Sequence, residues 1–298
     1  MIDTLGRPHA PAEELAALHE QRAFADRSPY RKLEVAGSDA RTWLNDLLTA
    51  AVARLSEGHA CRSLLLSPTG RIRADVHALP TNEGFLLLQD PAQPDTIGDL
   101  LAPYVLSSAV TLTDRTEDLG LYCVPGDAAE RVGWPGTRPS VLGAGEDLLT
   151  PPAGAARLES MMMNKQLTEV RDDALEVWRI RRGVARFPID LTVDSVPAEA
   201  DLDHLIDTEK GCFLGQESVA KIRNLGHPPR VIRALRIDAD VAPGAELMVD
   251  HVGVGRVTSA AAGPDGGSVC LARVSWAAAK APLTTRDGVP FAPLDRST

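Results

Sequence analysis

One stretch of eight residues carries the densest chemistry in the chain. It consists of Lys210, Gly211, Cys212, Phe213, Leu214, Gly215, Gln216 and Glu217. A thiol reacts and binds metals as the thiolate, and a free cysteine has a pKa of about 8.5, so a nearby cation favours the reactive form. Lys210 is such a cation if it lies close to Cys212, and the two glycines remove Cβ atoms around the sulfur. We predict Cys212 and Lys210 as a catalytic pair; the alternative is that Cys212 is a small buried hydrophobe in a turn.

Basic residues cluster next to this stretch and upstream of it. Residues 179–186 contain Arg179, Arg181, Arg182 and Arg186 without an acidic residue, in a chain whose formal net charge is −10. Such local reversals suit an anionic ligand, an RNA phosphate or an acidic protein. The alternative is that these arginines cover solvated faces of helices and strands.

The elements that must position these residues begin with a mixed first half. Hydrophobic periodicity predicts strands over 32–35, 63–66, 71–78, 85–89 and 110–112, and helices over 12–20, 39–48 (capped by Ser38) and 95–105 (opened by Asp95). Helices would then cover one face of a largely antiparallel sheet, an α+β arrangement.

A weaker copy of this order follows. Strands are expected over 121–124 and 140–142, and helices over 127–132, 172–182 and 216–224, with Gly183 and Gly226 as stops. After Pro229, short strands over 231–237, 246–250, 255–260 and 268–274, with a turn over 263–267, predict a small β-barrel.

Composition excludes several classes of protein. The 298 residues are 44% hydrophobic and 24% charged, which is typical of a globular chain. The net charge of −10 argues against direct nucleic-acid binding. The four cysteines have no metal-site spacing, so no metal site is predicted. The chain shows no secretory signal and no apolar run of about 20 residues, so we expect no membrane contact and a cytoplasmic location.

The octet 210–217 resembles the K-G-C-[FY]-x-G-Q-E signature of YgfZ-type folate-binding proteins. These are relatives of the glycine-cleavage T-protein (aminomethyltransferase) and are associated with iron–sulfur cluster assembly or repair. Residues 44–52 and 64–75 are similar to the family's L-x-T-N-D-V and L-x-P-x-G-R-I-x-A-D segments, respectively. Residues 177–199 are similar to its R-I-x-x-G-x-P-x-x-G-x-D and x-P-x-E segments.

The resemblance implies a duplicated antiparallel-sheet T-protein fold with a C-terminal small β-barrel. The domains expected from it are an N-terminal extension (1–30), a folate-binding core (31–229, with halves of about 31–115 and 116–229), the barrel (230–280) and a tail (281–298).

The resemblance also implies a site for tetrahydrofolate or a derivative. Its expected ligand-binding residues are Asp75, Glu199, Gln216 and Arg186, with Gly211, Phe213, Gly215 and Glu217 completing the motif. A carboxylate such as Glu199 can accept two N–H bonds from an aminopyrimidine edge. Two alanines depart from the family pattern: Ala51 follows Thr49-Ala50 where relatives carry Asn-Asp, and Ala74 stands where the enzymes carry a second aspartate.

Three functions remain open on the sequence. The first is a folate-binding protein of iron–sulfur cluster assembly or repair, supporting cluster enzymes such as those that modify tRNA, with Cys212 handling a transient cluster, sulfur or a one-carbon unit. Its partners would be client or assembly proteins. The second is a tetrahydrofolate-dependent aminomethyltransferase or demethylase with Asp75 as the catalytic carboxylate, which the loss of the neighbouring carboxylate disfavours. The third is a non-catalytic interaction scaffold.

Overall fold

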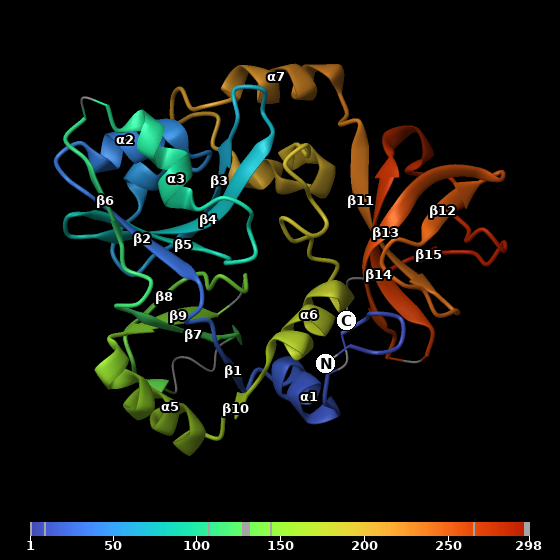
Figure 1. The fold of residues 1–298 in the computed structure, drawn as a ribbon, viewed down its shortest axis with the longest axis horizontal. Coiled ribbons are helices and arrows are strands. Elements are labelled where there is room, and N and C mark those ends of the chain that lie inside the picture. Colours follow the sequence, from blue (N-terminus) through green and yellow to red (C-terminus); the bar gives the residue numbers. More distant parts are fainter. Residues whose placement is uncertain are drawn as a thin grey trace. The chain divides into compact units, whose positions relative to one another are not determined.

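The computed structural model describes residues 2–8, 10–106, 108–126, 132–143, 145–264 and 266–294. The chain forms two compact units (Figure 1). Unit 1 consists of Met1–Leu15, Arg171–Leu202 and Ala220–Thr298, and unit 2 consists of Ala16–Val170 and Asp203–Val219. Helices α1 (Ala12–His19) and α7 (Gln216–Leu225) and the 3-10 turn η6 (Leu202–Leu205) each begin in one unit and end in the other.

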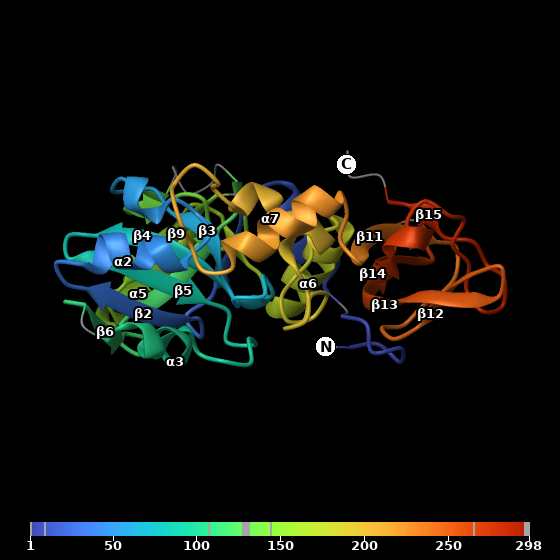
Figure 2. The ribbon, with the colours of Figure 1, turned by 90° about the horizontal axis from the view of Figure 1, so that it is seen from above.

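The first sheet of unit 2 is antiparallel throughout. Its order is β3 (Cys61–Leu66), β4 (Ile72–Thr81), β5 (Gly84–Gln89), β2 (Arg31–Ala36) and β6 (Thr111–Asp114). Helix α2 (Ala40–Leu47) lies against β5 (Figure 2). The other helical elements of this half are η1 (Val52–Arg54), α3 (Ile97–Leu101) and η2 (Ala102–Tyr104). The predicted strands and helices of this half are confirmed.

The residues predicted to start two helices of this half, Ser38 and Asp95, are each wrong by one residue. Asp39, not Ser38, is the N-cap of α2, and its side chain makes no capping bond. Thr96, not Asp95, caps α3, because the Thr96 hydroxyl oxygen accepts a hydrogen bond from the Asp99 amide at 3.0 Å. A hydroxyl at this position satisfies one of the open amides of the first turn.

The second sheet of unit 2 combines strands from the beginning and from the end of the segment Ala16–Val170. Its order is β10 (Thr168–Glu169), β1 (Ala23–Asp26), β7 (Gly120–Val124), β9 (Glu146–Thr150) and β8 (Gly136–Thr137). Only the β1–β10 pair is parallel among the strand pairs of the described residues. Helix α5 (Ala155–Asn164) follows η4 (Pro152–Gly154). The sequence did not predict β1 or α5.

The strand expected over 140–142 is wrong. The segment is a turn in which the Gly143 amide donates to the Ser140 carbonyl at 2.8 Å. The Ser140 hydroxyl is also held by the buried Asp147 carboxylate at 2.6 Å. A serine that binds a neighbouring side chain in this way competes with ladder pairing. The helix expected over 127–132 falls largely on residues 127–131, which lie outside the described residues.

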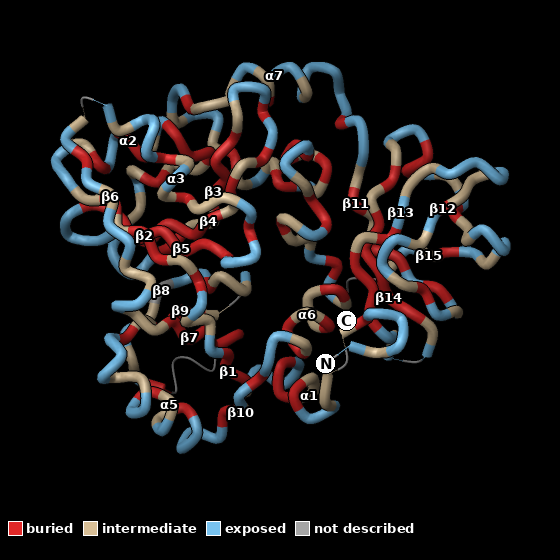
Figure 3. The backbone as a smooth tube through the Cα atoms, viewed as in Figure 1, coloured by how far each residue is buried: buried red, intermediate tan, exposed pale blue. Residues whose placement is uncertain are grey.

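Unit 2 is layered as helix, sheet, sheet, helix. One face of the first sheet packs against α2 through Ala74, Val76 and Phe85. Its other face meets the second sheet, with Leu79, Leu86 and Leu88 packed among Leu121 and Cys123. The far face of the second sheet packs on α5 through residues such as Phe24, Leu148 and Leu158. Strand β5 is therefore buried on both faces, as the burial colours of Figure 3 show.

Unit 1 is built on one antiparallel sheet. Its order is β12 (Glu246–Val249), β13 (Val252–Ala262), β14 (Ser268–Ser275), β11 (Arg230–Ile237) and β15 (Ala292–Pro293), with η7 (Trp276–Ala278) after β14. Helix α6 (Asp172–Arg181) packs on it through Val177 and Ile180, and η5 (Pro197–Ala200) follows in the chain. The four predicted strands are confirmed. Since β12 and β15 stand at the two ends of the order, closure into a barrel stays a prediction, as do the expected domain boundaries.

No helix among the described residues combines the length and the apolar character needed to cross a membrane.

Candidate ligand-binding site

The β3–β4 hairpin brings three polar side chains to one face of the first sheet. Arg62 is paired directly with His77, and Asp75 lies two residues before His77 on β4. Side chains alternate between the faces of a strand, so Asp75 and His77 share the face of Leu79, which looks toward the second sheet. Polar groups thus occupy the margin of a sheet–sheet interface.

Arg62 and Asp75 form a bidentate ion pair. The Arg62 Nε lies 2.9 Å from Asp75 Oδ1, and Nη2 lies 2.5 Å from Oδ2. The exposed fractions of the two side chains are 25% and 12%. Burial lowers the pKa of the guanidinium, but the charge and hydrogen bonds of Asp75 outweigh it, so the pKa of Arg62 is raised. Two parallel charge-assisted bonds hold the carboxylate in a fixed geometry.

His77 is 7% exposed, and within the described part of the chain its ring has no hydrogen-bond partner. Burial lowers its pKa to about 4, and the charge of Arg62 acts in the same direction while that of Asp75 opposes it. The ring is therefore neutral at physiological pH, with one nitrogen as donor and the other as acceptor.

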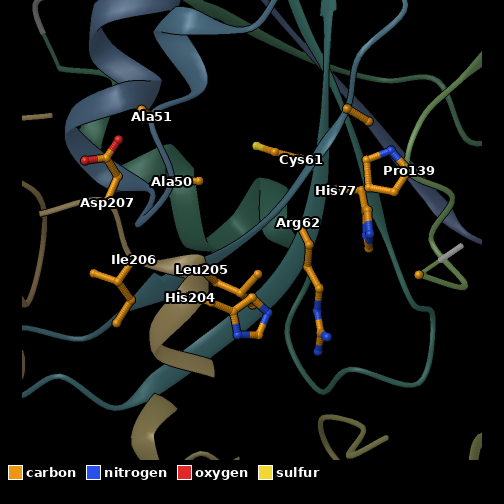
Figure 4. Close-up of a pocket in the computed structure, with 12 residues that line it drawn as sticks. Ala50, Ala51, Cys61, Arg62, His77, Pro139, His204, Leu205, Ile206 and Asp207 are labelled. Atoms are coloured by element: carbon orange, nitrogen blue, oxygen red, sulfur yellow. The ribbon is translucent and has the colours of Figure 1, made fainter. Parts of the chain in front are cut away.

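A cavity of about 620 Å³ opens beside these residues within unit 2. Its polar wall is made by Arg62, His77, His204, Asp207 and Cys61 (Figure 4). The remaining lining is small or apolar and comprises Ala50, Ala51, Ala60, Pro139, Gly143, Leu205 and Ile206. In Figure 4 the Arg62 and His77 side chains extend in the same direction from the paired strands. This volume is typical of a small-molecule site.

The octet borders the cavity wall through its upstream neighbours. The Asp207 amide donates to the Thr49 carbonyl at 3.0 Å, and the Asp207 carboxylate accepts from Arg54 at 3.2 Å. The segment 204–207 is thereby tied to the end of α2 and to η1, which carry Ala50 and Ala51 to the cavity.

Lys210 is directed to the carboxyl end of α2. Its ammonium group donates to the carbonyl oxygens of Asn45 and of Leu48, the latter at 2.5 Å. Its Nζ also lies 5.3 Å from the centre of the Phe213 ring. Burial lowers the pKa of Lys210 to about 8. A cation at this place satisfies open carbonyls and complements the helix dipole.

The charge of Lys210 acts on Cys61. Burial raises the pKa of the Cys61 thiol to about 11, and the charge of Lys210 counteracts this only in part. Cys212 is exposed and unpaired by any disulfide. The predicted activation of Cys212 by Lys210 has no contact to support it here, and the catalytic roles of both residues stay predictions.

The other motif residues anchor the segment in unit 2. Phe213 is buried, and Gly215 has a φ of +86° with the Ser67 carbonyl oxygen 2.6 Å from where a Cβ would stand. Gly211 has a φ of +102° in open space. Gln216 and Glu217 form the first turn of α7.

Glu199 and Arg186 belong to unit 1, whereas Asp75, Gln216 and the octet belong to unit 2. Glu199 is 1% exposed, and its Oε2 accepts a 2.8 Å hydrogen bond from Arg273 Nε. Its Oε1 is buried without a hydrogen-bond partner. Arg186 is tied to its own loop, since its amide donates to the Asp190 carboxylate at 3.0 Å.

The sequence analysis did not identify the polar lining residues Cys61, Arg62, His77, His204 and Asp207. A signal was present, because Asp75 and His77 are polar at alternate positions of a strand whose other face is Ile72, Ala74, Val76 and Ala78. The second sheet that covers this polar face could not be placed from the sequence.

The fold has a counterpart among solved structures. The structure resembles the crystal structure of the glycine cleavage system aminomethyltransferase T of Bartonella henselae, with a TM-score of 0.80, 20% identity, and coverage of 99% of this chain and 90% of that one. The chain therefore has an aminomethyltransferase-like fold. Residues 7–133 match the family model of the GCVT N-terminal domain.

Two sequence relatives cover most of the chain. A chloroplastic putative transferase of Arabidopsis thaliana is 25% identical over 281 residues, which are 85% of this chain and 65% of the relative. An aminomethyltransferase of Alcanivorax borkumensis is 20% identical over 289 residues, which are 88% of this chain and 80% of the relative.

Proposed function

We propose that this protein binds a reduced folate and acts in the assembly or repair of iron–sulfur clusters, including those of tRNA-modifying enzymes. The octet 210–217 supports this role, because it resembles the signature of the YgfZ-type proteins. The cluster, or its sulfur, would be a substrate that is passed to client proteins. Cys212 is the reactive thiol, and its exposure makes it accessible to a partner.

The observation that carries the folate part is the orphaned oxygen of Glu199. A buried carboxylate oxygen without a donor is costly, and Glu199 Oε1 is such an atom. The N–H groups of a folate's aminopyrimidine edge are donors of the required kind. Glu199 would hold that edge within unit 1, and the folate-binding roles of Asp75, Gln216 and Arg186 each stay predictions. When bound, the folate would supply a carrier for a one-carbon unit.

Calorimetric titration of anaerobically purified protein with tetrahydrofolate tests this assignment. Because a hydrogen bond to a charged group contributes about 1.5–3 kcal/mol, Glu199→Gln should weaken binding by a factor of about 10–100. Glu246→Gln is the matched control, because Glu246 pairs with Arg286 at an exposed site of the same unit. Equal affinities of both variants and the parent would remove Glu199 from the site.

The role of Cys212 is tested in cells. Cys212→Ala should leave the melting temperature and folate affinity unchanged, since the side chain is exposed, while the activity of cluster-dependent client enzymes falls. A strain carrying Cys212→Ala with unimpaired clients refutes the role of the thiol. It would leave the folate site untouched.

A second candidate is a tetrahydrofolate-dependent aminomethyltransferase, favoured by the named activity of the relatives. Its catalytic carboxylate would be Asp75. That carboxylate accepts two parallel hydrogen bonds from Arg62, which opposes its use as a base. Steady-state turnover of an aminomethylated or N-methylated substrate with tetrahydrofolate as the acceptor of the one-carbon unit decides between the candidates. Absence of both folate binding and turnover would favour the interaction scaffold.

A further inference from the structure

Unit 1 carries two stacked rings at its surface, those of His227 and Trp276. Their centroids lie 5.1 Å apart, and the angle between the ring planes is 7°. His227 is exposed, and 39% of Trp276 is exposed. A tryptophan is highly buried on average, and tryptophans that contact a partner often contribute much of the binding energy of an interface. The stack is therefore a candidate contact point for a partner.

The backbone holds the two rings in this arrangement. The Trp276 amide donates to the Pro229 carbonyl oxygen at 3.0 Å, and the neighbouring residues Arg230 and Ser275 pair across β11 and β14. His227 Nδ1 lies 3.1 Å from the Pro228 carbonyl oxygen. Because the rings are already ordered, a partner that docks on them would lose little side-chain entropy.

Two stretches without acidic residues meet at this stack. Residues 218–237 contain five basic residues and no Asp or Glu, and residues 268–286 contain three basic residues and no Asp or Glu. The stretches adjoin because β11 pairs with β14 along its whole length (Figure 1). Lys221, Arg230 and Lys280 are exposed and form no ion pair within the described part of the chain. The surface is thus positive in a chain whose net charge is −10.

We call this region the Trp276 surface; it comprises Leu225, His227, Arg230, Trp276 and Lys280. Leu225 adds apolar area, since it is 75% exposed at the end of α7. An apolar centre with a charged rim is typical of protein–protein interfaces. A nucleic acid would meet the same cations, but the net charge of −10 opposes contact with a long phosphate backbone. A short acidic protein segment fits both the charge and the exposed apolar side chains.

We propose that the Trp276 surface docks an acidic segment of a partner protein. An apolar side chain of the segment packs on Trp276, and its carboxylates lie beside Arg230 and Lys280. None of these residues takes part in the proposed folate site or in the chemistry of Cys212, so the docking does not depend on the proposed function.

Fluorescence anisotropy with a labelled model peptide tests the docking on the full chain. The probe is a peptide of repeated Glu-Asp-Phe triplets, which combines negative charge with apolar side chains. A peptide of Glu-Asp-Ser repeats should bind at least about tenfold more weakly, because it lacks the side chain that packs on the tryptophan. Lys-Lys-Phe repeats should not bind. Failure of the Glu-Asp-Phe peptide to bind overturns the proposal, and an oligouridylate that binds as tightly would assign the surface to RNA instead.

Two variants locate the binding on this surface. Trp276→Ser should weaken binding of the Glu-Asp-Phe peptide by about 10–100-fold, as expected for a tryptophan at the centre of an interface. Lys280→Glu leaves the stack in place and should weaken binding by about tenfold at low salt and less at high salt, because salt screens exposed charges. Val252→Ser is the matched control, since Val252 is apolar, 63% exposed and part of β13 in the same unit.

The control variant should bind like the parent. Circular dichroism melting shows that each variant is folded before its affinity is compared. Unchanged affinity of either folded variant, Trp276→Ser or Lys280→Glu, overturns the proposal. No folate is present in these titrations, so their failure leaves the proposed function intact, and absence of folate binding in calorimetry leaves the docking surface intact.

Discussion

His77 should lower the free energy of unfolding as the pH falls, and replacing this one residue should remove its contribution. The ring is buried, and it is faced by Arg62 across the hairpin and by Asp75 on its own strand. Burial lowers its pKa from 6.5 to about 4 in the folded state. His77→Gln retains the size and polarity of the side chain but cannot titrate.

The sign follows from proton uptake. Between pH 4 and 6.5 the unfolded state binds the proton and the folded state does not, so stability falls as the pH falls through this window. The contribution is complete above pH 6.5 and lost by pH 4. Over the whole window, the pKa shift of His77 contributes about 3 kcal/mol to the free energy of unfolding. About 2 kcal/mol of this contribution is lost between pH 7.5 and 5.0.

Asp147 opposes this effect in the same pH range. It is fully buried, and burial raises its pKa from 3.8 to about 6, although bonds from Cys123, Ser140 and Val141 limit the rise. Here the folded state binds the extra proton, so acidification from pH 7.5 to 5.0 stabilises the protein by about 1 kcal/mol. The parent should therefore show only a small net loss.

Urea unfolding at pH 7.5 and 5.0, followed by circular dichroism and tryptophan fluorescence, separates the two groups. His77→Gln should become more stable on acidification, relative to its own value at pH 7.5, by about 1 kcal/mol. Asp147→Asn should lose about 2 kcal/mol over the same interval. Comparing each variant with itself removes any constant cost of the substitution. If His77→Gln follows the parent within error, the fold does not hold the ring neutral, and the argument fails.

Two further predictions concern the octet. Gly215→Ala should lower the free energy of unfolding by about 3 kcal/mol, because the residue needs a positive φ and its new Cβ would meet the Ser67 carbonyl. Gly211→Ala, at a residue with a positive φ but open space around it, should lower it by about 1 kcal/mol. Equal losses of the two variants in urea unfolding would contradict this explanation. Lys210→Met should destabilise the folded protein by about 1–3 kcal/mol, because it leaves the Asn45 and Leu48 carbonyl groups without a donor. Lys221→Met, on the exposed side of α7, is the control and should leave stability unchanged. An unchanged stability of Lys210→Met would show that water replaces the ammonium group.

Strong periodicity made much of the fold predictable. The helix over 40–47 was found because Ala40, Trp43, Leu44 and Leu47 recur at helical spacing, and all four are buried. Strand β4 was found because alternate residues are apolar, and these pack against α2. Such patterns report which face an element buries, which is information contained within one segment.

Pairing between distant segments was not predictable. Strand β1 has four residues, and its place between β10 and β7 depends on partners about 100 and 145 positions away along the chain. The polar face of β4 looks like a solvated surface until the second sheet is placed over it. For this reason Asp75 and His77 could be noticed as alternating polar residues, while the burial that changes their chemistry could not.

The octet illustrates the same limit at the level of function. Its composition placed Lys210 beside Cys212 in sequence, and chain proximity suggested activation of the thiol. The structure shows a further role for this lysine, because its ammonium group binds the end of α2, and its action on Cys212 stays a prediction. The lysine then positions the segment that carries Asp207 to the cavity. A Lys210→Met protein should accordingly lose stability, whereas a lysine that served only Cys212 would leave the free energy of unfolding unchanged.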